Sequence, residues 1–157
     1  MEVERKYRLS ARPDGLDAHE SNRLEQGYLA LDPAGAEVRV RRKGAKHILT
    51  VKTGKGLARG EEEVTLAAAD FDRLWPLTDG RRVLKTRYLV PLDGGLTAEV
   101  DVYEGALDGL LTAEVEFADE AAAHAFAAPE WMGEDVTGDP RYANQALAVS
   151  GLVPSAG

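Results

Sequence analysis

The chain has 157 residues, of which 44% are hydrophobic and 29% are charged, a composition typical of a globular protein. This length can bury a core without disulfides or structural metals, so we expect one domain over residues 1–157. The absence of cysteine excludes thiolate chemistry, and the net charge of −8 argues against a nucleic-acid partner. We see no secretory signal and no apolar run near the roughly 20 residues of a membrane helix, so we expect a cytoplasmic protein that does not bind membranes.

Eight short segments are predicted to be β-strands because apolar and polar residues alternate along them. In chain order they cover residues 2–9, 26–31, 37–42, 47–52, 59–66, 83–90, 96–103 and 111–117. Most are joined by short turns, which favour antiparallel neighbours. Eight such strands predict a mainly β (α+β) fold, a closed eight-stranded antiparallel β-barrel with peripheral helices, and a two-sheet sandwich is the alternative.

Three helices are predicted around these strands, over residues 67–75, 120–127 and 139–149. Asp119 is the expected N-cap of the second helix. Asp139 and Pro140 are expected to open the third, and Gly151 lies just past its end. Residues 12–24 are ambiguous, with a short helix as one reading.

Most of the predicted strands carry charged or polar residues two positions apart, and therefore on one face. A polar face is most simply a solvated one, but here the signs segregate by strand and the opposite faces are apolar enough to be covered by helices. The basic members are Lys6, Arg39, Arg41, Lys52, Lys85 and Arg87. The acidic members are Glu2, Glu4, Glu61, Glu63, Glu99, Asp101, Glu114 and Glu116.

If the sheet closes, all of these side chains point into one interior. A cluster of carboxylates repels itself unless a cation lies among them, and hard oxygen ligands suit Mg²⁺ or Mn²⁺. The basic group suits a polyanion, because Arg matches the geometry of phosphate oxygens. A metal beside a basic cradle is the general apparatus of phosphoryl transfer.

The residues also resemble a known family. Residues 2–6, EVERK, resemble the ExExK opening of the CYTH superfamily, also called triphosphate tunnel metalloenzymes. Further segments follow in the family's order: GYL at 27–29, VRVR at 38–41, LTVK at 49–52, EEE at 61–63, KTRY at 85–88, VDVYEG at 100–105 and AEVE at 113–116. WMG at 131–133, VT at 136–137 and RYAN at 141–144 are similar to the short bacterial branch, with Met132 where Leu is commoner.

This resemblance implies an eight-stranded barrel whose tunnel binds a triphosphate and a divalent metal. Carried over by position, the implied metal ligands are Glu2, Glu4, Asp101, Glu114 and Glu116, with Glu61 and Glu63 serving a metal or its water. The implied phosphate-binding residues are Lys6, Arg39, Arg41, Lys52, Lys85 and Arg87. Lys6 and Tyr28 match a pair that is implied to activate water, and Tyr28 could equally serve only to fix Lys6. The C-terminal helix is implied to pack at one tunnel mouth, with Arg141 and Asn144 reaching inward.

The function implied is hydrolysis of inorganic tripolyphosphate to pyrophosphate and phosphate, with Mg²⁺ or Mn²⁺ as cofactor. Dense charge and only 6% aromatic residues fit a substrate without a base to recognise. The alternatives are an adenylate cyclase of the same superfamily, a nucleoside or thiamine triphosphatase, and a polyphosphate-binding sensor. Whether the chain forms a homodimer is left open.

Overall fold

The computed structural model describes residues 3–54 and 60–155, and the strands within these ranges form one antiparallel sheet. The strands are β1 (Val3–Arg8), β2 (Ser21–Leu31), β3 (Glu37–Lys43), β4 (Lys46–Thr53), β5 (Gly60–Thr65), β6 (Arg82–Pro91), β7 (Thr97–Glu104), β8 (Leu111–Phe117) and β9 (Glu134–Asp135). Their order across the sheet is β5-β4-β3-β2-β6-β7-β8-β1-β9. The sheet therefore contains all eight predicted strands and one short strand that was not predicted.

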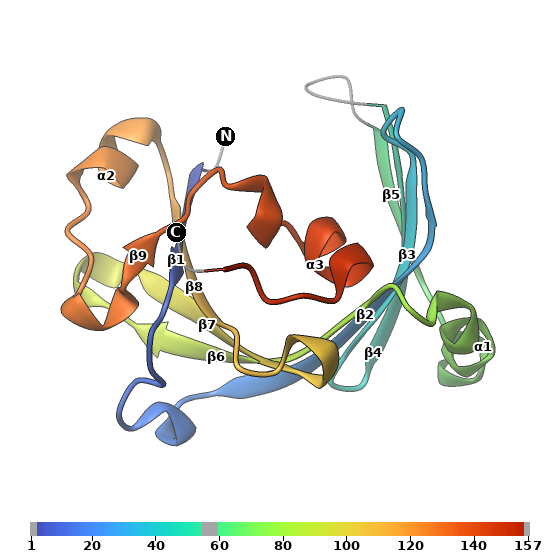
Figure 1. Ribbon diagram of the computed structural model, residues 1–157, viewed down its shortest axis with the longest axis horizontal. Helices are drawn as coiled ribbons and strands as arrows, with labels where there is room; N and C mark the ends of the chain where they lie inside the picture. Colours follow the sequence, from blue (N-terminus) through green and yellow to red (C-terminus); the bar gives the residue numbers. More distant parts are fainter. Residues whose placement is uncertain (1–2, 55–59, 156–157) are drawn as a thin grey trace.

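The sheet curves into a trough (Figure 1). Strands β1, β7 and β8 form one arm, β6 and β2 form the floor, and β3, β4 and β5 form the other arm. Strands β5 and β9 are the two edges and do not pair with each other, so the predicted closed barrel is not formed. Part of the reason is that β9 already occupies the outer edge of β1, where Asp135 and Glu134 pair with Tyr7 and Arg8.

Strand β2 extends further than predicted. The segment that was ambiguous in the sequence contains a 3₁₀ turn, η1 (Leu16–Ala18), and then enters β2 at Ser21. The beginning of β2 pairs with β6, where Ser21 lies opposite Tyr88 and Leu24 opposite Lys85. Long-range pairing therefore makes a strand of a segment whose own residues do not alternate clearly.

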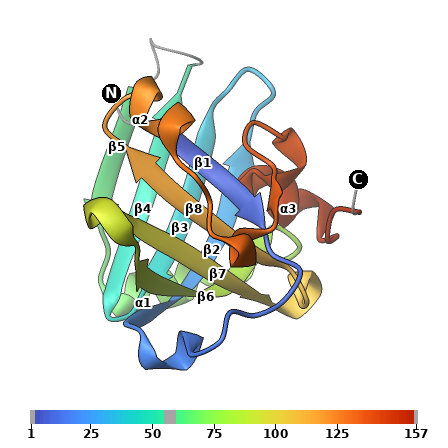
Figure 2. The same ribbon diagram turned by 90° about the vertical axis from the view of Figure 1, so that its left-hand side faces the viewer.

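Three α-helices lie around the sheet: α1 (Ala68–Leu74), α2 (Glu120–Ala125) and α3 (Asn144–Ser150). Helices α1 and α2 pack outside the trough, and Figure 2 shows α2 in front of β1 and β8. The Asp119 side chain accepts the backbone N–H of Ala122, which confirms it as the N-cap of α2. The remaining 3₁₀ turns are η3 (Trp75–Thr78), η4 (Asp93–Gly95), η5 (Gly105–Leu107), η6 (Glu130–Met132) and η7 (Pro140–Tyr142).

The third predicted helix is divided in two. Asp139 accepts the N–H of Arg141 and so caps only the short turn η7. Ala143 is then extended, with φ −65° and ψ 141°, and α3 begins after it and ends at Gly151 in the left-handed region. The break turns α3 into the concave side of the trough, whereas the resemblance implied that this helix packs at one mouth of a closed tunnel.

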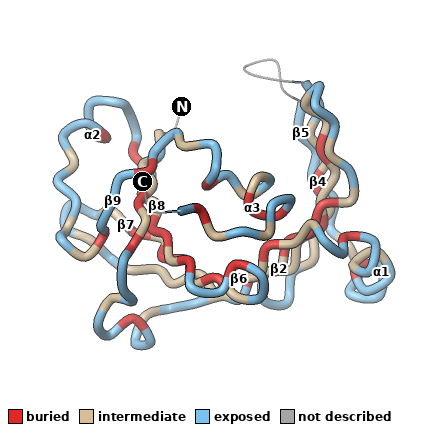
Figure 3. Tube along the Cα trace, viewed as in Figure 1, coloured by how far each residue is buried: buried red, intermediate tan, exposed pale blue. Residues whose placement is uncertain are grey.

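The buried residues form two hydrophobic clusters on opposite faces of the sheet. The convex cluster joins the outer face of β1, β7 and β8 to α2, through residues that include Tyr7, Val115 and Ala123. The concave cluster joins the trough to α3, through residues that include Tyr28 and Leu147. Figure 3 shows that burial concentrates along β7 and β8, whereas every described residue of β5 is exposed. One end of the concave face is therefore apolar and covered by α3.

Strand β2 approaches η3 closely at Gly27. A Cβ atom at this position would lie 2.4 Å from Oγ1 of Thr78 and 2.5 Å from its Cβ. Thr78 is fully buried, and its hydroxyl donates to the Trp75 carbonyl at 2.7 Å and accepts from Arg82 Nε at 2.9 Å. Glycine is needed here because that side chain has no room to move. Within the described residues, no helix is long and apolar enough to cross a membrane.

Candidate functional site

The predicted lining residues share the concave face of the sheet. Residues that lie opposite each other in an antiparallel pair point to the same face. The pairs that show this are Lys6 with Glu114, Glu4 with Glu116, Arg87 with Asp101, Tyr28 with Arg39, Lys52 with Glu61 and Lys85 with Tyr103. Glu2 lies outside the described residues.

Asp101 stands at the centre of an ion-pair network on β6 and β7. Its carboxylate accepts two hydrogen bonds from Arg87, at 2.8 and 2.9 Å, and lies 2.8 Å from Lys85 Nζ. Glu99 adds a further ion pair to Arg87 at 2.7 Å. The Asp101 side chain is only 1% exposed, and although burial opposes ionisation, Lys85 and Arg87 hold the pKa of Asp101 below its usual value. Asp101 therefore fixes the orientation of two basic side chains.

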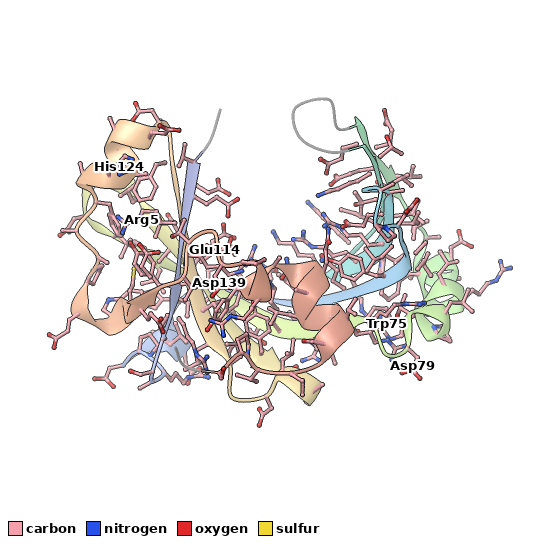
Figure 4. The ribbon with its side chains drawn as sticks, turned by 45° about the horizontal axis from the view of Figure 1, so that its top comes forward. Arg5, Trp75, Asp79, Glu114, His124 and Asp139 are labelled. Carbon is pink, nitrogen blue, oxygen red and sulfur yellow. The ribbon has the colours of Figure 1, made fainter. Side chains whose placement is uncertain are left out.

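Acidic side chains gather on β1 and β8, in the same arm of the trough as β7. Burial raises the pKa of Glu4, and the charges of Glu114 and Glu116 raise it further. Among the described residues, Lys6 forms an ion pair with this group: its Nζ lies 3.2 Å from Glu114 and donates to the Tyr142 carbonyl at 2.7 Å. In Figure 4, Glu114 lies on the side of β1 that faces α3, whereas Arg5 and His124 lie on the α2 side. These carboxylates repel one another, and a divalent cation between them would relieve that repulsion.

Basic side chains of β3 and β4 have few anionic partners. In the part of the chain that the structure describes, neither Arg41 nor Lys52 has an ion pair within 4.0 Å. Burial, together with the charges of Arg87 and Arg39, lowers the pKa of Arg41. The Nε atom of Arg39 is buried and has no hydrogen-bond partner. A small cleft of about 50 Å³ lies among Arg41, Lys85 and Arg87. This is the electrostatic environment of an anion site.

Lys6 and Tyr28 have different partners. The Tyr28 hydroxyl accepts a hydrogen bond from Gln26 Nε2 at 2.9 Å, whereas Lys6 contacts Glu114 and the C-terminal segment. Burial raises the pKa of Tyr28, and the charge of Glu37 raises it further. Tyr28 is therefore held in its protonated form, and the structure does not join the two residues as a pair.

The remaining predicted acids do not join the Glu4 group. Glu61 and Glu63 lie exposed on edge strand β5, on the other arm of the trough, and Asp101 is enclosed by cations. Among the described residues, no three acids or histidines are close enough together to hold a metal ion as they stand. The carboxylates of Glu4, Glu114 and Glu116 nevertheless supply the hard oxygen donors that Mg²⁺ and Mn²⁺ prefer.

The C-terminal segment contributes polar groups to the middle of the trough. Besides the Tyr142 carbonyl, the Oδ1 atom of Asn144 accepts from Lys85 Nζ at 3.5 Å, as expected for a residue reaching inward. Gln145 Nε2 donates to Glu37 at 2.7 Å. Arg141, expected to reach inward as well, is exposed and pairs with Asp139 at 2.8 Å. The segment thus blocks one end of the charged surface.

Sequence reasoning gave no role to Glu37, Gln145 or Glu99, although it counted Glu99 among the lining acids. Glu37 begins β3 and lies on the same face as Arg39, so its period-two spacing was a usable signal. Gln145 carried no such signal in the sequence, because the position of its side chain depends on how α3 enters the trough.

The amino-acid sequence is similar to a known protein family and to characterised proteins. The model of the CYTH domain family matches residues 1–143. An inorganic triphosphatase of Nitrosomonas europaea is 46% identical over 149 residues, covering 95% of this chain and 97% of that protein. An inorganic triphosphatase of Acetivibrio thermocellus is 37% identical over 152 residues, covering 93% of this chain and 92% of that protein.

Solved structures agree with these sequence relatives. A crystal structure of an inorganic triphosphatase superposes with a TM-score of 0.82 at 42% identity, covering 99% of this chain and 97% of that one. A Hippeastrum protein considered an adenylyl cyclase and described as having a dominant triphosphatase activity shares the fold, with a TM-score of 0.61 at 16% identity and 98% of each chain covered.

Proposed function

The chain belongs to the CYTH domain family, and we propose that it is an inorganic triphosphatase that hydrolyses tripolyphosphate to pyrophosphate and phosphate. Both named relatives are inorganic triphosphatases and match over nearly their whole length. A triphosphate small molecule is therefore the substrate class. A cytoplasmic location, the absence of a nucleic-acid or membrane partner, and a homodimer stay predictions.

The observation that carries this proposal is a partly buried group of basic side chains on the concave face. Arg41 lies beside Arg39 and Arg87 and has no ion pair among the described residues, and burial and these neighbours lower its pKa. The charges of Glu63 and Glu99 offset only part of this effect. A chain of phosphate groups would supply the missing negative charge. Lys52 and Lys85 extend the same cradle along β4 and β6.

The family implies a divalent metal, and we propose Mg²⁺ or Mn²⁺ held by Glu4, Glu114 and Glu116, with Glu2 completing the set from outside the described residues. When bound, such a metal neutralises charge on the substrate and lowers the pKa of coordinated water. Glu61 and Glu63 face the trough from the other arm, which suits contacts to a second metal or to its water. Lys6 lies next to Glu114, with its Nζ 3.2 Å from that carboxylate, where its ammonium can hold a phosphate oxygen beside the acids.

Asp101 is better assigned to the cradle than to the metal. All of its described contacts are cationic, and it is almost completely buried. Freeing its oxygens for a metal would leave Lys85 and Arg87 without their partner. We therefore assign Asp101 as a positioning residue that presents Lys85 and Arg87 to phosphate.

The pair of Lys6 and Tyr28 remains the candidate for activating water, with unequal support for its members. Tyr28 can act as a base only after its hydroxyl has lost its proton. The raised pKa of Tyr28 works against that loss near the working pH. The Tyr28 hydroxyl suits a hydrogen-bonding role, in which it orients neighbouring groups. Lys6 lies next to the acids and is the better-placed member of the pair.

Product analysis tests the proposed function. Purified protein is incubated with tripolyphosphate or ATP, each with Mg²⁺ and with Mn²⁺, and the phosphate, pyrophosphate and cyclic AMP are quantified. We expect phosphate and pyrophosphate in equal amounts from tripolyphosphate, and slow reaction of ATP. Cyclic AMP from ATP would identify a cyclase instead, and tight binding without turnover would identify a sensor.

A further inference from the structure

Glu37 is a buried carboxylate that belongs to neither the metal group nor the phosphate cradle. It is the first residue of β3, and its side chain is 2% exposed. A buried carboxylate needs partners, because removing its charge from water costs several kcal/mol. Those partners indicate what Glu37 does in the trough.

Within the described residues, Glu37 contacts Arg39 on its own strand and Gln145 on α3, two residues that are far apart in sequence. One oxygen, Oε2, lies 3.2 Å from Arg39 Nη1 and accepts its hydrogen bond. The other oxygen, Oε1, accepts from Gln145 Nε2 at 2.7 Å. Glu37 therefore joins the first turn of α3 to a guanidinium of the proposed cradle.

Glu37 fixes the Arg39 guanidinium at one corner, because Nη1 donates to its carboxylate. The Arg39 side chain is only 16% exposed, and its Nε atom is buried without a hydrogen-bond partner among the described residues. A planar guanidinium that is held at one corner points its remaining donors in fixed directions. The direction of the Arg39 guanidinium is thus set before a substrate arrives.

We propose that Glu37 is a positioning residue for Arg39, and that Gln145 fixes the Glu37 carboxylate in turn. The inference rests on the proposed function, in which Arg39 binds a phosphate group. Helix α3 then takes part in substrate binding without touching the substrate, because its docking sets the direction of Arg39. Glu37 acts only through Arg39.

A competing explanation is that Glu37 acts only as a negative charge near a polyanion. Removing that charge would then strengthen substrate binding, and its geometry would not matter. Glu37→Asp separates the two explanations, because it keeps the charge and withdraws the carboxylate by one methylene. The Glu37–Gln145 pair borders a cavity of about 400 Å³, so the shorter side chain leaves room for water and causes no clash.

The experiment compares Glu37→Asp, Arg39→Ala and the double variant, with KM and kcat for tripolyphosphate measured at saturating Mg²⁺. We expect Glu37→Asp to raise KM on the order of tenfold, as for loss of one charge-assisted hydrogen bond, with a smaller change in kcat. In the Arg39→Ala background the same substitution should change KM by less than about twofold, because its target is gone. Gln145→Ala, at an exposed position, should also raise KM. This effect too should be seen only when Arg39 is present.

Glu25→Asp is the matched control. Glu25 is a partly buried carboxylate on neighbouring β2 that pairs with Arg42 at 2.8 Å and Arg23 at 3.3 Å on the convex face. The same loss of one methylene there should leave KM unchanged, and thermal unfolding of every variant separates loss of fold from loss of binding. An equal KM effect of Glu37→Asp with and without Arg39, or an unchanged KM, would overturn the inference.

Turnover by the wild-type protein tests the proposed function separately from this inference. If the wild type binds tripolyphosphate without hydrolysing it, the same comparison is made on dissociation constants from calorimetry. A tenfold weaker affinity that depends on Arg39 supports the inference in that case too, and an unchanged affinity overturns it.

Discussion

Replacing Asp101 with Asn removes one charge from the most buried ionic contact of the trough. Asn keeps the size of the side chain but leaves buried Lys85 and partly buried Arg87 without a full counter-charge. Breaking a buried ion pair from one side costs about 3–5 kcal/mol. In a domain of this length, where about 1 kcal/mol shifts Tm by roughly 2–4 °C, even the lower value lowers Tm by roughly 6–12 °C.

The assay is thermal unfolding followed by circular dichroism, combined with steady-state kinetics over a range of Mg²⁺ concentrations. We expect Asp101→Asn to lower Tm and raise KM for tripolyphosphate, with the Mg²⁺ concentration for half-activation unchanged. Glu99→Gln is the control, because Glu99 is on the same strand and face but is 25% exposed and joins Arg87 by one contact. Its Tm should fall by much less, since exposed ion pairs contribute only about 0–1 kcal/mol.

The effect should also depend on pH. The pKa of Asp101 is lower in the folded protein than its usual 3.8, so its stabilisation is fully present above that value. It is lost as the pH falls through the lower pKa of the folded state. The difference in Tm between wild type and variant should therefore be constant near neutral pH and narrow below about pH 4. A variant with unchanged Tm and substrate KM but a raised Mg²⁺ requirement would refute the positioning role and restore Asp101 as a metal ligand.

Three further predictions follow from individual contacts. Glu4→Gln should abolish metal-dependent turnover while Tm stays equal or rises, because the raised pKa of Glu4 means that its charge is unfavourable in the fold. Retained turnover would contradict the proposed metal site. Tyr28→Phe should keep kcat within about tenfold of wild type, whereas Lys6→Met should reduce kcat at least a hundredfold. Equal losses of kcat in the two variants would support Tyr28 as the base that activates water. Gly27→Ala should cost about 1–3 kcal/mol in urea unfolding, because the new Cβ meets fully buried Thr78, and unchanged stability would show that η3 can move.

The period-two pattern predicted which residues share a face because strand geometry is local and strict. Arg39 and Arg41 share one face of their strand, as Glu114 and Glu116 do, whatever the rest of the chain does. The curvature and edges of the sheet are not local properties. Closure of the barrel depends on whether β5 pairs with β1. The short strand β9, Glu134–Asp135, pairs at the edge of β1, and two residues are too few to show a periodic pattern in the sequence.

The course of the C-terminal segment could not be predicted for a related reason. Asp139 and Pro140 are a sound helix-start signal, and they do start a turn. One extended residue, Ala143, then redirects the chain, and nothing about an alanine announces this. Every contact of Asn144 and Gln145 with the trough follows from that redirection, so the contact of Gln145 with Glu37 could not be predicted from the sequence.

Because the sheet stays open, β5 presents an unpaired strand edge to other copies of the chain. Such edges are where proteins aggregate, and cells select against long uncharged ones. Here three consecutive glutamates, Glu61 to Glu63, put negative charge on both faces of the exposed strand, so two such edges repel each other. Divalent cations bind carboxylates and cancel that repulsion. Colloidal stability and metal supply are therefore linked: the ions expected to serve the trough would, in excess, favour self-assembly along β5.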